Sequence, residues 1–220
     1  GHGRLSAAQL GATSGMALAQ GGAGTLPAAL EAAGERPEIC GAKDGVNGAD
    51  ARGRTRLHDA AQHGRLADVQ VLLASEAFTQ AGARDAKGRT ALHLAAQGGT
   101  EGHIEAIKAL LASERFLEAD AVDARLWTGL HVAALHGHAD VVLALLESPR
   151  FAAAGRRDSE GFTALHLAGL KGHADVAAAL AAHPRWHHGD AADRRGQTAL
   201  DLALMRGHAE AAAAMLSDVN

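Results

Sequence analysis

One ten-residue pattern recurs along the chain and constrains the fold more than any other feature. It begins at Thr55, Thr90, Thr128, Thr163 and Thr198 and reads TRLHDAAQHG, TALHLAAQGG, TGLHVAALHG, TALHLAGLKG and TALDLALMRG. Successive threonines lie 35, 38, 35 and 35 residues apart, and the long interval contains a turn, residues 98–102, that is three residues longer than its equivalents. A regular period of this length predicts a stack of similar units, which offers an extended binding surface rather than a closed catalytic pocket.

Each unit is predicted to hold two short helices. Thr is a favourable residue at a helix N-cap, and Leu92, Ala95 and Ala96 then fall at i, i+3 and i+4, which gives the first helix one apolar stripe. A glycine is expected to supply the turn into the second helix, where a positive φ is favourable only for glycine. These turn glycines are Gly64, Gly102, Gly137, Gly172 and Gly207. Apolar pairs on the second helices cannot be buried within one unit, so neighbouring units must stack.

The repeated unit closely resembles the ankyrin repeat, whose signature is Thr-Pro-Leu-His-x-Ala at a period of about 33 residues. The resemblance implies an all-α ankyrin-repeat solenoid with hairpin tips between the helix pairs. Each tip runs from an Asp to the capping Thr. We expect a degenerate N-terminal capping repeat plus a long loop at 1–52, and five repeats at about 53–87, 88–125, 126–160, 161–195 and 196–220.

Two departures from the ankyrin pattern carry structural expectations. Leu126 stands where the other tips have glycine, and leucine is unfavourable at positive φ, so we expect the third tip to be altered. The units are also longer than the consensus after the second helix. That extra length contains a recurrent aromatic residue, which its regular spacing predicts to pack beneath the loop: Phe78, Phe116, Phe151 and Trp186.

The first fifty residues differ in composition from the rest, and two interpretations stay open. The segment 13–30, TSGMALAQGGAGTLPAAL, aligns with the repeat and predicts a capping unit. Alternatively, Arg4, the lack of acidic residues before Glu31 and the run 17–19 indicate the remnant of a targeting segment. The chain does not begin with Met, which indicates processing or a fragment. The single Cys40 excludes an internal disulfide and favours an intracellular, reducing compartment. No apolar run approaches about 18 residues, so no membrane-spanning helix is predicted.

The fourteen histidines do not predict catalysis or metal binding. Eight recur at two fixed positions of the unit, and the resemblance to ankyrin repeats implies that they bond within and between units. An irregular cluster at 183–188 lacks the spacing of known metal sites. We therefore expect no catalytic residue, no metal and no cofactor. The eight recurrent histidines are His58, His93, His131 and His166 after Thr-x-Leu, and His103, His138, His173 and His208 after glycine.

Partners of ankyrin stacks usually meet the concave side, formed by the tips and the exposed end of each first helix. Those positions are strongly basic here, although the net charge of the chain is −4. Trp127 and Phe162 share one tip position and are the expected aromatic anchors, unless they pack on each other. As tip residues, they are expected to support little of the core. The predicted partner-binding residues are Arg52, Arg54, Lys87, Arg89, Arg125, Trp127, Phe162, Lys171, Arg194 and Arg206.

These features favour a non-catalytic protein-interaction module, an adaptor or a scaffold subunit of a larger assembly, that binds an acidic and apolar partner. Nucleic-acid binding by the basic face is an alternative, although the negative net charge opposes it. A regulatory segment of a larger enzyme is a further alternative.

Overall fold

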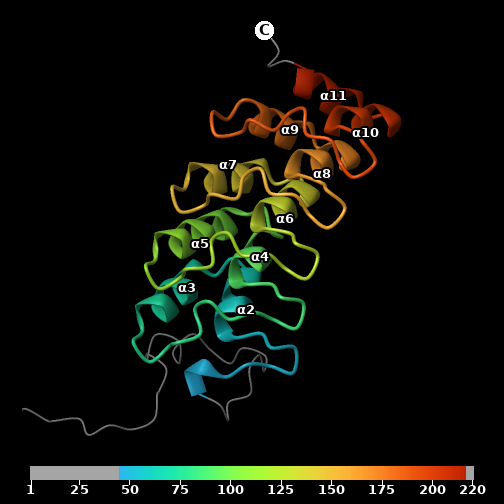
Figure 1. Cartoon of the computed structure of the whole chain (residues 1–220). Helices are drawn as coiled ribbons and strands as arrows, with labels where there is room; N and C mark the ends of the chain where they lie inside the picture. The colour runs from blue at the N-terminus through green and yellow to red at the C-terminus, as the bar shows by residue number, and fades with distance from the viewer. Residues whose placement is uncertain (1–44, 217–220) are drawn as a thin grey trace, which may run out of the picture.

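The computed structural model describes residues 45–216 and shows an elongated stack of five consecutive helix pairs (Figure 1). The predicted all-α solenoid is confirmed. First helices pack on first helices and second helices on second helices, and the tips project on the side away from the second helices. After a short 3-10 helix, η1(Gly45–Asn47), the pairs are α2(Arg56–Gln62) and α3(Leu66–Ala74), α4(Ala91–Ala95) and α5(Glu101–Ala112), α6(Gly129–His136) and α7(Ala139–Glu147), α8(Ala164–Lys171) and α9(Ala174–Ala181), α10(Ala199–Met205) and α11(Ala209–Leu216).

The repeat boundaries given above stay a proposal, and most of the predicted N-terminal cap, including the aligned segment 13–30, lies outside the described residues. Within residues 45–216, no helix is long and apolar enough to cross a membrane.

The core is a column of thin layers that runs through the stack. In the first helices Leu57, Leu92 and Leu130 are fully buried among small alanines. The loop aromatics are also buried, with Phe78, Phe116 and Phe151 at 0% exposure and Trp186 at 6%, so their predicted packing role is confirmed.

The long turn of the second unit differs from the prediction. Gly102 was expected to form the turn into the second helix with a positive φ, but α5 already begins at Glu101 and includes Gly102. The glycine is needed there for a different reason. A Cβ at Gly102 would lie 2.4 Å from the carbonyl oxygen of Gly64, so only glycine allows the two backbones to approach this closely.

The expectation of an altered third tip is wrong. Leu126 adopts φ +64°, in the left-handed region, and the tip keeps its hydrogen bonds. The Leu126 N–H donates to the carbonyl of Asp123 (3.0 Å), and the Asp123 N–H donates to the carbonyl of Trp127 (2.9 Å). The neighbouring tips hold this one on both sides, since the Ala124 N–H donates to the carbonyl of Lys87 (3.0 Å) and the Ser159 N–H donates to the carbonyl of Arg125 (3.2 Å). These contacts outweigh the local conformational cost, which is about 1–2 kcal/mol for a residue with a Cβ.

Replacing Leu126 by glycine is therefore expected to stabilise the protein by about 0.5–1 kcal/mol. The strain is relieved at a half-exposed side chain, and part of that gain is offset by the greater freedom of glycine in the unfolded chain. Urea unfolding followed by circular dichroism measures the difference. Ala124→Gly, at an exposed position of the same tip, is the control and should be destabilising. A Leu126→Gly variant no more stable than the parent would contradict the strain argument.

Candidate partner-binding face

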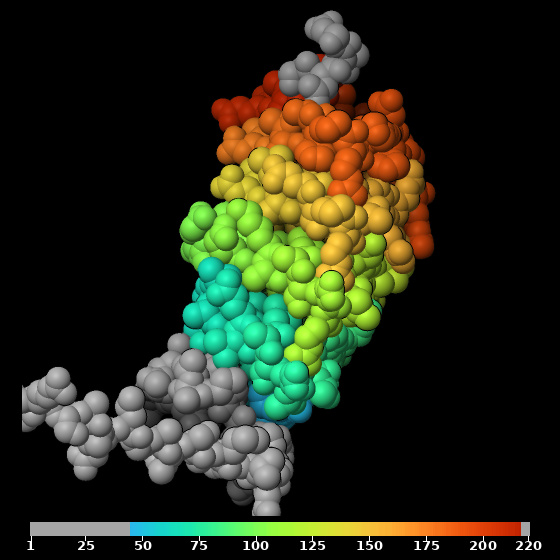
Figure 2. Space-filling model, turned by 90° about the vertical axis from the view of Figure 1, so that its left-hand side faces the viewer, coloured from blue at the N-terminus to red at the C-terminus, as the bar shows by residue number. Residues whose placement is uncertain are grey.

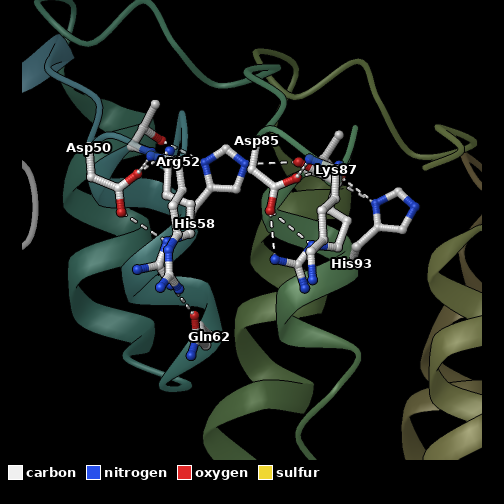
Figure 3. A network of polar contacts seen from close by, with 11 residues as sticks. Asp50, Arg52, His58, Gln62, Asp85, Lys87 and His93 are labelled. Carbon is white, nitrogen blue, oxygen red and sulfur yellow. Dashed lines mark hydrogen bonds and ion pairs between the residues drawn. The ribbon is translucent and has the colours of Figure 1, made fainter. Parts of the chain in front are cut away.

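Each tip is organised by its aspartate. In the second tip, Asp85 Oδ1 accepts hydrogen bonds from the N–H groups of Lys87 and Arg89, both at 2.9 Å. The other tips repeat this arrangement, and Figure 3 shows the first two side by side, with Asp50 and Asp85 in equivalent places. Burial alone would raise the pKa of Asp85, but hydrogen bonds from Arg89 and Lys87 outweigh it and hold the pKa below its usual 3.8. The same balance lowers the pKa of Asp50 and Asp193.

Successive tips are joined into a backbone ladder. The Ala86 N–H donates to the carbonyl of Arg52 (2.8 Å), and the Ala124 N–H donates to the carbonyl of Lys87 (3.0 Å). Side chains two positions after each Asp are left exposed on the outer edge of this ladder. These outward residues are Arg52, Lys87, Arg125, Glu160 and Arg195.

The Thr-x-Leu-His histidines reach forward to the next unit. The Thr90 N–H donates to His93 Nδ1 (3.2 Å), so the ring proton is assigned to Nε2, which donates to the carbonyl of Trp127 (2.8 Å). His58, His131 and His166 bind the next tip in the same way, at 3.0, 3.2 and 3.1 Å. Burial lowers the pKa of all four rings despite the bonds to carbonyls, which favours the neutral form.

The Gly-His histidines reach backward instead. His103, His138 and His173 donate from Nε2 to the carbonyls of Gln62, Gln97 and Leu135 in the preceding unit, at 3.0–3.1 Å. His208 lies against Gly172, where an added Cβ would come within 2.6 Å of its Nδ1. The predicted bonds between units are thus confirmed for the seven recurrent histidines other than His208.

The predicted basic residues fall into two groups. Arg54 and Arg89 are half-buried and held against their own tips, with Arg54 Nε 3.0 Å from Asp50 Oδ2 and Arg89 Nη2 2.7 Å from Asp85 Oδ2. The other six are exposed and form no ion pair with any residue in 45–216. These six are Arg52, Lys87, Arg125, Lys171, Arg194 and Arg206.

The two aromatic residues at the tips are more integrated than expected. The Trp127 indole N–H donates to Asp158 Oδ2 in the next tip (2.8 Å), and the Arg125 guanidinium lies 5.2 Å from the centre of the Trp127 ring. Phe162 stacks on His166, with ring centres 5.6 Å apart. Both aromatic side chains are half-buried against the core. The expectation that they support little of the core is therefore wrong. Trp127 and Phe162 do not pack on each other, and the ring contacts seen are those of Trp127 with Arg125 and of Phe162 with His166.

Sequence reasoning missed a set of arginines that join consecutive units on the far side of the stack. Arg150 donates to the carbonyls of Leu111 (3.1 Å), Ser113 and Phe116 (2.6 Å), at the end of the preceding second helix and its loop. Arg115 and Arg185 repeat this contact one unit earlier and one unit later. The available signal was an arginine directly before the loop aromatic in three consecutive units.

Repeated helix pairs, Asp-centred tips and inter-unit histidines define a helical repeat protein with a long exposed face. The family comparison identifies the repeat, because a family model of ankyrin repeats, described as three copies, matches residues 57–154 and 130–220. The chain belongs to the ankyrin repeat family. A search of curated proteins gave no match. In the described part of the chain, no three histidine, cysteine or acidic residues are grouped so that they could hold a metal ion.

Proposed function

We propose that the chain is a non-catalytic adaptor or scaffold subunit that binds an acidic and apolar surface of another protein on its concave face. Ankyrin repeats are in general protein-interaction modules. The finer proposal rests on the six exposed cationic side chains without ion-pair partners, defined above, which are spread along the stack. The half-buried rings of Trp127 and Phe162 lie in the third and fourth tips, and Arg125 contacts the Trp127 ring. Cations of this kind attract an acidic partner, and aromatic side chains beside arginine are typical of interface hot spots. We also propose an intracellular, reducing compartment, from the single cysteine.

Site-directed photo-crosslinking in native extract tests this proposal. A benzophenone amino acid at Ala124, an exposed residue of the third tip, should yield a protein adduct, whereas the same group at Ala178, exposed on α9, should not. The same adduct from both positions, or no adduct from Ala124, would contradict the proposed face. An Ala124 adduct removed by nuclease would instead favour nucleic-acid binding.

Once the partner is captured, the double variant Lys87→Glu/Arg125→Glu is expected to slow association about tenfold at low salt. Exposed charges at an interface mainly steer the encounter and are screened by salt, so the difference should shrink as the ionic strength rises. Stopped-flow or surface plasmon resonance at two salt concentrations measures it. Lys108→Glu, on α5, is the control and should leave the rate nearly unchanged. An association rate that does not respond to the double variant would exclude this face.

A further inference from the structure

A groove lies on the opposite side of the stack, between the second helices α5 and α7. These helices lie on the left of Figure 1, on the side that faces the viewer in Figure 2. Two adjoining hollows of about 350 and 390 Å³ form the groove, and they share Lys108, Ala144 and Glu147. The first hollow extends to Glu101 and Asp140, and the second extends to Pro149.

The groove contains a feature that breaks the period of the stack. α5 has 12 residues, whereas the other second helices have eight or nine, because the long turn of this unit adds residues at its N-terminal end. Glu101, the first residue of the lengthened helix, lines the first hollow. Insertions into single repeats often lie on a binding face, since the regular stack does not require them.

The walls of the groove are negatively charged. Glu101, Asp140 and Glu147 are exposed and form no ion pair with any residue in the described range. The helix dipole favours Glu101 and Asp140, which lie in the first turns of their helices, but it disfavours Glu147, the last residue of α7. Fold stability therefore gives no reason for a carboxylate at the centre of the groove.

The two cations beside these carboxylates are already engaged. Lys108 Nζ is 2.7 Å from Glu105 Oε1, and Arg150 binds the backbone carbonyls described above. The hydrogen bond and charge of Glu105 raise the pKa of Lys108, and Glu101 and Glu147 add to this effect. The potential in the groove therefore favours an added positive charge.

The floor of the groove is apolar. Ile104, Leu111 and Ala144 are between 4% and 8% exposed, and Leu143 and Ala112 are more accessible along the edge. An apolar floor beneath acidic walls fits a chain segment that carries apolar and cationic side chains close together.

We propose that this groove is a second docking surface, which binds a peptide segment of a partner protein in which lysine or arginine alternates with apolar residues. Its preference is opposite to that of the concave face, which is expected to favour acidic partners. Two faces with opposite preferences would let one chain hold two different proteins at once, as a scaffold does.

Selection from an unbiased library of random displayed dodecapeptides on the full chain tests the proposal. One class of the enriched peptides is expected to combine lysine or arginine with apolar residues, whereas any acidic peptides are expected to bind the concave face. A selected peptide, labelled with fluorescein, is then titrated by fluorescence anisotropy. The triple variant Glu101→Gln/Asp140→Asn/Glu147→Gln should weaken its binding at least tenfold.

A matched triple variant, Glu114→Gln/Asp175→Asn/Glu210→Gln, removes the same charge from the second-helix side outside the groove and should change the affinity less than twofold. Ala112→Trp narrows the groove without changing any charge and should also weaken binding, which keeps the test valid if the first triple variant fails to fold. No enrichment of peptides that combine lysine or arginine with apolar residues, or equal effects of the two triple variants, would overturn the proposal. None of these results depends on crosslinking at Ala124, so a failure of the groove proposal can be distinguished from a failure of the concave-face proposal.

Discussion

Replacing His93 by alanine is expected to lower the free energy of unfolding by about 3 kcal/mol. The change leaves the Thr90 N–H and the Trp127 carbonyl without their bonds to the ring, and each unpaired buried group costs about 1–3 kcal/mol. His93 is also fully buried, so the loss of the ring opens a cavity between two units. Urea unfolding followed by circular dichroism measures the effect.

The matched control is His187→Ala, because His187 is exposed and outside the recurrent positions. That variant should lie within about 0.5 kcal/mol of the parent, as is usual for surface substitutions. A loss below about 1 kcal/mol in His93→Ala would show that the forward-reaching histidines are not required for stacking.

Acidification is expected to destabilise the protein below about pH 6.5, well before the carboxylates titrate. Burial lowers the pKa of His58, His93, His131 and His166 from the usual 6.5, so the unfolded chain binds more protons than the folded chain just below that pH. Stability therefore rises with pH in this window and is lost as the pH falls. Each histidine contributes a slope of at most about 1.4 kcal/mol per pH unit.

A second loss of stability should follow below about pH 3.8. The pKa of four aspartates is lowered in the folded chain, so their protonation favours unfolding; they are Asp50, Asp85, Asp193 and Asp201. Urea midpoints between pH 8 and pH 3 measure both steps. His93→Gln should reduce the slope of the first step and leave the second unchanged. A flat stability profile from pH 8 to pH 5 would contradict the neutral, buried state of the four rings.

The same contacts that stabilise the stack also position the proposed concave face. His93 binds the carbonyl of Trp127, and Trp127 binds Asp158, so a proposed aromatic anchor is held by the units on both sides. Variants of Trp127 must therefore be measured for stability as well as for affinity, because a change in either can reduce binding.

The sequence by itself determined the class of fold, the repeated helix pairs, and the structural place of the recurrent histidines and aromatics. It could do so because these features repeat at a fixed spacing, and because capping residues and apolar stripes act within a few residues of one another. The positive φ at Leu126 was not predicted, because the leucine is unfavourable locally and is held there by its neighbours.

Only the tertiary structure decided what each surface residue can offer to a partner. It paired Arg54 and Arg89 with aspartates, engaged Trp127 with Asp158, and brought Glu101 and Glu147 into the lining of one groove between α5 and α7. It also assigned Arg150 to carbonyls 34–39 residues earlier in the chain. The physical reason is that contacts between units join residues about one period apart. Many acceptors in these contacts are backbone carbonyls. Because every residue carries one, the sequence does not indicate which carbonyl is bound.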